Sequence, residues 1–354
     1  MGSNRYWPLA LTMILVGAAL RYPAFGYDFA ADDYAQIAMM EGGYPSPRHP
    51  LSLFSFSTGE REDVQALMDA GFFPWFSHPE LRLSMFRPLA SAMMWVDHGL
   101  FGRWALGYHI HSLLWWLALL LVAAWTFRRL LGDRLGLLAT LFFVLDEVHG
   151  VMMGWIANRN AMVSALLGLL ALTAHVRARE RGEPMPHRVW IYFLIALTAG
   201  EYTLCMLAYF VAFELVERHP DPVVRRLRAL APLLALSLGF LVLRSALGFG
   251  SHASDLYIDP TRDPLRFLAV ATDRLPVMIS DLVLTLRADW WSFGVPPPFD
   301  LAGVYQGPAP LERWRVIQEG VGWVGLLVVG LAAVVALRGR APVSREVVRV
   351  RWLL

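Results

Sequence analysis

The sequence has few charged residues, a single cysteine and no lysine. Charged side chains make up 17% of the 354 residues, against about 25% in soluble domains. Cys205 is alone, so a disulfide framework is excluded. All 31 basic residues are arginine, and a formal net charge of +2 offers no broad basic surface for nucleic acid. The chain also lacks a detectable internal repeat.

Apolar residues make up 56% of the chain and gather in long blocks separated by arginine-rich stretches. A helix needs about 20 apolar residues to cross the hydrocarbon core. The sequence therefore predicts an all-α, polytopic integral membrane protein with about eight transmembrane helices. The predicted spans are residues 6–22, 106–127, 135–151, 159–176, 189–204, 204–217, 229–248 and 320–337.

Two features of these spans allow another interpretation. The first span is short because Arg21 ends it, but no small-residue cleavage site follows, which favours a retained signal anchor over a signal peptide. The fifth and sixth spans form one apolar block that Gly200 and Glu201 interrupt. That block could instead be one long helix, which would invert the orientation of everything after it.

The distribution of arginine predicts the orientation. With the N-terminus inside, 17 of the 31 arginines lie in short cytoplasmic segments, as the positive-inside rule requires. Residues 28–104 then lie outside and carry ten acidic residues against five arginines. The outer loops, residues 23–104 and 249–318, are too long for simple connectors. Amphipathic stretches predict helices in them at Val64–Phe76, Leu81–Asp97 and Asp263–Leu286.

The sequence also predicts how the chain divides into two parts and in which membrane the protein is located. Residues 1–250 would form a transmembrane module that includes the first outer loop, and residues 251–354 the second outer loop with a final span. The ending Arg351-Trp352-Leu353-Leu354 looks like the start of another span, so we expect the natural chain to continue. The all-arginine, single-cysteine composition favours a bacterial inner membrane, with the outer face in the periplasm.

Ionisable residues gather on the predicted outer face. Asp32 and Asp33 form an acidic pair shortly beyond the first span, although Asp32 also suits the N-cap of a helix that begins at Asp33. Arg87 and Arg159 lie at the outer ends of spans, where a guanidinium either binds a phosphate or snorkels to the interface. Snorkelling fits Arg244, near the end of the seventh span, best.

Further polar side chains are predicted on the same face. Asp146 and His149 are three positions apart and suit one helix face. Glu201 interrupts an apolar block where the chain should turn outside. The spacing favours a hydrogen-bonded cluster over a metal site, so no cofactor is required, while the carboxylates are compatible with a divalent metal. The set comprises His109, His111, Asp146, Glu147, His149 and Glu201.

The order of these motifs resembles the GT-C superfamily of polytopic membrane glycosyltransferases. The likeness is closest to the protein O-mannosyltransferase-like branch and its tetratricopeptide-bearing relatives, and it covers roughly residues 1–250. This chain has Gly200-Glu201 where many relatives have a Lys-Glu pair. The matching motifs are Asp32-Asp33, Phe86-Arg87-Pro88-Leu89, Asp97, the stretch from Gly102 to Gly107-Tyr108-His109, Glu147-Val148-His149 and Trp155-Ile156-Ala157-Asn158-Arg159.

The resemblance implies transfer of a monosaccharide from a polyprenyl-phosphate-linked donor to a protein, lipid or polysaccharide acceptor outside the membrane. The expected partners are thus the lipid bilayer, this donor and an acceptor of unknown kind. One of Asp32 and Asp33 would be the base for the acceptor hydroxyl, with Asp32 favoured. Arg87 and Arg159 would neutralise the donor phosphate. The supporting residues would be His109, Glu147, His149 and Glu201.

Two other functions fit parts of the pattern. A transporter or flippase of lipid-linked or small anionic substrates would also use arginines within its spans. Transporters, however, usually bind their substrates near the bilayer midplane between repeated halves, and no repeat is found here. An inactive assembly partner is the third alternative, because the cation expected at residue 200 is missing.

Overall fold

The computed structural model is mainly helical, and it describes most of the chain before residue 255 and parts of the remainder. The chain divides into two compact units, the first holding the described residues up to Ser254 and the second those from residue 258 onward. Of the predicted site residues, Glu147 lies outside the described residues, as do most of the second outer loop and part of the last span. The described residues are 5–146, 148–216, 221–254, 258, 260, 263–284, 318–328, 330, 331 and 334.

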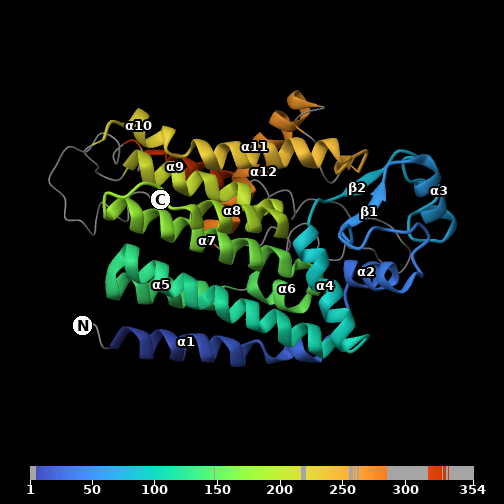
Figure 1. Cartoon of the computed structure of the whole chain (residues 1–354), viewed down its shortest axis with the longest axis horizontal. Coiled ribbons are helices and arrows are strands. Elements are labelled where there is room, and N and C mark those ends of the chain that lie inside the picture. The colour runs from blue at the N-terminus through green and yellow to red at the C-terminus, as the bar shows by residue number, and fades with distance from the viewer. Residues whose placement is uncertain are drawn as a thin grey trace. The chain divides into compact units, whose positions relative to one another are not determined.

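The first unit consists of helices with one small sheet (Figure 1). Its α-helices are α1 (Tyr6–Leu20), α2 (Asp32–Glu41), α3 (Arg61–Asp69), α4 (Pro88–Phe101), α5 (Ala105–Leu145), α6 (Val148–Gly154), α7 (Arg159–Glu180), α8 (His187–Ala199), α9 (Met206–Val216), α10 (Val223–Arg228) and α11 (Ala231–Ala246). Short 3-10 turns are η2 (Tyr22–Gly26), η3 (Ile156–Asn158) and η4 (Glu201–Cys205). The strands are β1 (Ser55–Thr58), β2 (Arg82–Ser84) and β3 (Gly250–His252).

Among the described residues, three helical segments are long and apolar enough to cross a membrane, namely Tyr6–Gly26, Ala105–Leu145 and Ile156–Glu180. Helices α8 and α11 are shorter apolar helices in the described part of the chain. Contacts run from α1 to α5, from α5 to α7, from α7 to α8 and from α8 to α11 (Figure 1). Large apolar side chains of these helices, such as Leu15, Leu238 and Val242, are exposed. Such a surface suits lipid better than water.

Helix α5 is a hairpin of two helices that reverses at Gly132. Gly132 has φ 77° and ψ −177°, a conformation that essentially only glycine adopts. The rings of Phe127 and Phe143 are 5.7 Å apart, whereas along one straight helix these residues would be separated by about 24 Å. A Cβ on Gly136 would lie 2.8 Å from the Cα of Arg128, so the two arms approach closely at this glycine. The hairpin occupies the region where the sequence predicts two spans.

The apolar block from residue 189 to 217 also reverses direction. Helix α8 ends at Ala199, Gly200 is extended, and η4 leads into α9. The rings of Phe193 and Phe210 lie 6.1 Å apart, while one continuous helix would separate these residues by about 25 Å. The alternative of a single long helix is therefore wrong, because the chain turns at Gly200 and Glu201.

A three-stranded antiparallel sheet corrects the all-α prediction. Strand β2 pairs with β1 on one side and with β3 on the other. The strands are too short to produce a clear alternating pattern in the sequence, and β3 lies far from the other two along the chain. Because β3 follows α11 directly, the end of α11 and residues 55–84 lie on the same side of the helices. Residues of the two predicted outer loops therefore pair in one sheet.

Two amphipathic stretches of the first outer loop begin or end differently from the prediction. Helix α3 ends at Asp69, and Gly71 with φ +76° leads the chain away. The stretch from Leu81 begins as strand β2, and the helix α4 starts only at Pro88, whose fixed φ suits the first helical position. In the second unit, α12 (Pro264–Leu284) lies where the sequence predicts helical spacing, and residues 318–328 are helical.

Candidate functional site

Asp33, in the first turn of α2, is fully buried and bound by backbone amides. Its Oδ1 accepts the N–H of Ala157 at 2.6 Å, and its Oδ2 accepts those of Ala30 at 3.0 Å and Ile156 at 3.3 Å. Burial raises the pKa of this carboxyl, while the three amides and the nearby His109 act in the opposite direction. Both oxygens of Asp33 are thus engaged in joining the start of α2 to η3.

Asp32 is the first residue of α2, and its carboxylate forms no hydrogen bond or ion pair with the described residues. Burial raises the pKa of Asp32, the neighbouring Asp33 raises it further, and Arg87 lowers it. The N-cap position belongs to Ala31, so the N-cap interpretation of Asp32 is wrong. Ala31 has φ 47° and ψ −113°, a strained conformation for a residue with a Cβ, of a kind that concentrates at functional sites.

Arg87, which directly precedes α4, and Arg244 of α11 approach the same carboxylate. The Arg87 Nε donates to Glu201 Oε2 at 2.9 Å, and the Arg244 Nε lies 3.7 Å from Glu201 Oε1. The Arg87 guanidinium also lies over the rings of Phe54 and Tyr202, at 5.2 and 5.3 Å. Arg244 therefore faces Glu201 rather than extending alone to an interface. The side chains of Arg87, Arg244 and Glu201, named here the arginine cluster, carry one excess positive charge.

Arg159 is buried and turned toward Asp97. Its Nη2 donates to the Asp97 carboxylate, and its Nη1 lies 2.8 Å from His111 Nδ1. His111 also contacts Asp97 at 2.5 Å and accepts the indole N–H of Trp115 at 2.9 Å. Asp97 is fully buried and Arg159 is 2% exposed. The guanidinium expected to bind the donor phosphate is thus neutralised by a carboxylate that connects α4, α5 and α7.

The predicted histidines occupy different surroundings. His109 is buried, its Nδ1 contacts a carbonyl oxygen of α6 at 2.9 Å, and its Nε2 has no partner in the described part of the chain. It lies close enough to Asp33 to influence that carboxyl. His149 packs edge-on against Phe143 and Trp116, with ring centroids 4.8 and 6.0 Å away. His149 is therefore a core residue of the α5–α6 region.

Asp146 is engaged at the end of α5. Its carbonyl oxygen accepts Arg21 Nη2 at 2.7 Å, and its Oδ1 accepts the N–H of Val148 at 3.0 Å. Asp146 thus terminates one helix and starts the next. No group of three or more His, Cys, Asp or Glu side chains that could hold a metal occurs among the described residues.

A second buried charge cluster lies at the other end of α7. Glu214 of α9 is fully buried and contacts one histidine and two arginines, with distances of 2.7 Å to His175 Nε2, 2.9 Å to Arg179 Nε and 3.1 Å to Arg226 Nε. About 24 Å of helix separates His175 from Arg159 at the start of α7. This cluster joins α7, α9 and α10 and lies apart from the Asp32 region.

Comparison with known proteins finds no relative of this chain. No family model, no curated protein and no solved structure matches the chain.

Three partners in this region could not be predicted from the sequence. Arg244 joins Glu201, so cations reach this carboxylate although residue 200 is glycine. Asp97 and His111 bind Arg159. Asp97 and Arg159 appeared in separate motifs of the resemblance, but nothing in their spacing along the chain indicated that they pair.

Proposed function

We propose that this protein is a GT-C-type membrane glycosyltransferase that moves a monosaccharide from a polyprenyl-phosphate-linked donor to an acceptor hydroxyl. The observation that carries the proposal is the position of Asp32, an unpaired carboxylate with a raised pKa, within electrostatic reach of Arg87 in the arginine cluster. The first group suits proton abstraction and the second suits an anion. The order of the motifs along the chain, which resembles that of GT-C enzymes, supports the same function.

The charge of the arginine cluster matches that of the donor. A sugar joined to a prenyl chain through one phosphate is a diester with a single negative charge, and the cluster has one excess positive charge. When the sugar leaves, the phosphate becomes a monoester and gains negative charge, which Arg87 and Arg244 would stabilise. Their side chains are 13% and 27% exposed, so a phosphate reaches them without unfolding the site. Glu201 holds both arginines in position.

The proposed reaction is a single displacement with inversion, as the resemblance implies. The Asp32 carboxylate takes the proton of the acceptor hydroxyl, and the acceptor oxygen forms a bond to the anomeric carbon. The bond between that carbon and the phosphate oxygen breaks, and the polyprenyl phosphate leaves with the electron pair. Burial and the adjacent Asp33 raise the pKa of Asp32, which makes it a stronger base.

Asp33 and Arg159 have positioning roles in this proposal. Asp33 holds η3 next to the acidic pair through its contacts with Ile156 and Ala157. Arg159 follows η3 directly and ties it to Asp97. The sequence assigns phosphate binding to Arg159. In this proposal Arg244 binds the phosphate instead, because its side chain is the more exposed of the two.

The proposed topology has about eight spans, the number that the apolar blocks of the sequence predict. Both outer loops, with their amphipathic helices, face the periplasm of a bacterial cell, and the donor reaches the site from the membrane. The pairing of β3 with β2 supports the placement of both loops on one side.

Transfer of radiolabelled sugar from synthetic polyprenyl-phosphate donors, by the purified full chain in lipid nanodiscs, tests the proposal. With protein, lipid and saccharide hydroxyl acceptors supplied, we expect release of polyprenyl phosphate by the unmodified protein and loss of release in Asp32→Asn. A matched control is Asp69→Asn, an exposed carboxylate whose hydrogen bond goes to Gln65, which should retain full turnover.

Two results would contradict the proposal. Full turnover in Asp32→Asn would show that Asp32 is not the base. No turnover of any donor would show that the protein does not catalyse this transfer. Binding of donor without turnover, together with movement of donor between leaflets of a vesicle, would instead favour a flippase.

A further inference from the structure

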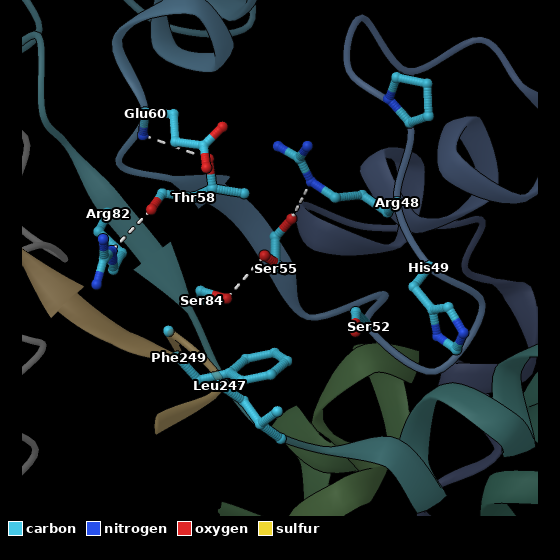
Figure 2. Close-up of a pocket in the computed structure, with 12 residues that line it drawn as sticks. Arg48, His49, Ser52, Ser55, Thr58, Glu60, Arg82, Ser84, Leu247 and Phe249 are labelled. Atoms are coloured by element: carbon cyan, nitrogen blue, oxygen red, sulfur yellow. Dashed lines mark hydrogen bonds between the residues drawn. The ribbon is translucent and has the colours of Figure 1, made fainter. Parts of the chain in front are cut away.

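A cavity of about 310 Å³ lies in the first unit beside the three-stranded sheet. Ligand pockets usually have volumes of about 300–1,000 Å³, so this cavity has room for a small ligand. The cavity is lined by residues 47–49, 52, 55, 58, 60, 82, 84 and 247–249, which Figure 2 shows. None of the proposed catalytic residues lines it.

One of the two arginines in the cavity wall has a structural role. Arg48 donates to the carbonyl oxygens of Ser55 and Phe56, to the hydroxyl of Ser46 and to Asp63 at 2.7 Å. The side chains of Arg48 and Asp63 are each 5% exposed. The Arg48 charge is therefore neutralised and its donors are occupied by the wall itself.

Arg82 differs from Arg48, because no described carboxylate neutralises its charge. Its Nε donates to the carbonyl oxygen of Thr58 at 2.7 Å, which holds the side chain against β1 (Figure 2). No described carboxylate forms an ion pair with Arg82, and its two terminal nitrogens have no hydrogen-bond partner among the described residues. A guanidinium held by its Nε presents these two nitrogens as a fork that fits a carboxylate or phosphate.

The rest of the lining comprises hydroxyl groups, an imidazole and an aromatic ring, together with the carboxylate of the exposed Glu60. The Ser52 hydroxyl has no hydrogen-bond partner in the described part of the chain. His49 uses its Nδ1 to accept the N–H of Leu51 and leaves Nε2 for a ligand. Phe249 lines the opposite wall (Figure 2) and offers an apolar surface for the C–H face of a ring.

The cavity adjoins the arginine cluster through Phe249. The backbone N–H of Phe249 donates to the carbonyl oxygen of Arg244 at 3.0 Å. The ring of Phe249 lies 5.0 Å from that of Phe86, the residue before Arg87. The same wall therefore separates the cavity from the arginine cluster.

We infer that this cavity binds the acceptor, and that the acceptor is a saccharide that carries one anionic group, a carboxylate or a phosphate. Arg82 binds the anionic group, Ser52 and His49 bind hydroxyls, and the ring packs on Phe249. The assignment of this saccharide as the acceptor rests on the proposed transferase function, whereas the binding of a saccharide in the cavity does not.

Equilibrium binding to the full chain in nanodiscs, with no lipid donor present, tests this inference. The probe is a fluorescein-labelled disaccharide that ends in glucuronic acid, with its glucose-terminated equivalent and glucose 6-phosphate as competitors. We expect saturable binding of the acidic probe and weaker competition by the neutral disaccharide. Competition by glucose 6-phosphate would extend the anionic group to a phosphate, and its failure would restrict it to a carboxylate.

Amino-acid substitutions test whether the probe binds in the cavity or elsewhere on the surface. Arg82→Gln should weaken binding of the acidic probe about tenfold or more, and Ser52→Phe, which fills the cavity from a loop, should abolish binding. Arg61→Gln is the matched control, because Arg61 is 76% exposed and pairs with Glu80 at the surface. Unchanged binding in both cavity variants, equal binding of the neutral and acidic probes, or no saturable binding would each overturn the inference.

The outcome is independent of the transfer assay. Binding that depends on Arg82, combined with a lack of donor turnover, would refute the transferase while leaving the saccharide site. Donor turnover without saccharide binding would refute the cavity and leave the transferase.

Discussion

Asp33 and Ala157 are 124 residues apart in the chain, and the Asp33 carboxylate accepts the Ala157 amide at 2.6 Å. This contact, with the one to Ile156 at 3.3 Å, holds the turn that precedes Arg159. The adjacent Asp32 forms no such contact. The two members of the acidic pair therefore have different roles, one in positioning the backbone and one as a free carboxylate.

Asparagine substitutions should separate these two roles. Asp33→Asn places an NH2 group against backbone N–H donors, which should destabilise the fold by about 1–3 kcal/mol. Asp32→Asn removes no hydrogen bond, and its effect on stability should stay within about 0.5 kcal/mol. Thermal unfolding of both variants in one detergent measures the difference. Equal melting temperatures for the two variants would contradict this division.

The pH dependence of transfer should follow Asp32. Burial first, and then the charge of Asp33, raises its pKa above the usual value near 3.9. A base works only when deprotonated, so activity should be lost as the pH falls through this raised pKa. The acid limb should thus lie at higher pH than for an ordinary aspartate.

Arg87→Gln should move this acid limb further toward neutral pH, because Arg87 lowers the pKa of Asp32. The residual rate of the variant, normalised to its own maximum, gives the profile even if donor binding is weakened. Arg61→Gln, an exposed arginine outside the site, provides the comparison. A limb that moves to lower pH in Arg87→Gln would show that another group controls the rate.

Breaking the buried pair between Asp97 and Arg159 should be costly. Asp97→Asn leaves the Arg159 guanidinium buried without a counter-charge, which typically destabilises by about 3–5 kcal/mol. The double variant Asp97→Asn/Arg159→Gln should recover part of this loss, because it removes the uncompensated charge. Unfolding of the single and double variants forms the measurement. Additive losses in the double variant would mean that the two residues do not interact.

The hairpin in α5 should depend on Gly132. Gly132→Ala forces a residue with a Cβ into a conformation that essentially only glycine adopts, at a cost of about 1–3 kcal/mol. Gly239→Ala in α11 is the control, because nothing lies within 4 Å of the added Cβ and the replacement of a helical glycine should stabilise by about 0.5–1 kcal/mol. If both substitutions raise the melting temperature, the chain does not reverse at Gly132.

The sequence by itself determined the helices and the chemistry available to the protein. Apolar blocks interrupted by arginine indicated the helical segments, because helix formation depends on neighbours within a few residues. The acidic pair, Arg87 and Glu201 stood out because ionisable groups beside apolar segments are costly. The sheet was missed because its strands of three or four residues pair across long distances in the chain.

Only the tertiary structure decided which of these charges meet. The same residue type acquired different surroundings at Arg159, which pairs with Asp97, at Arg87 and Arg244, which share Glu201, and at Arg82, which has no described counter-charge. Asp32 and Asp33 are chemically identical neighbours, yet Asp33 is fully engaged while Asp32 has no hydrogen-bond or ion-pair partner among the described residues. Each partner lies on another helix or strand, and the distance between two side chains on different elements depends on how those elements pack rather than on their spacing in the chain.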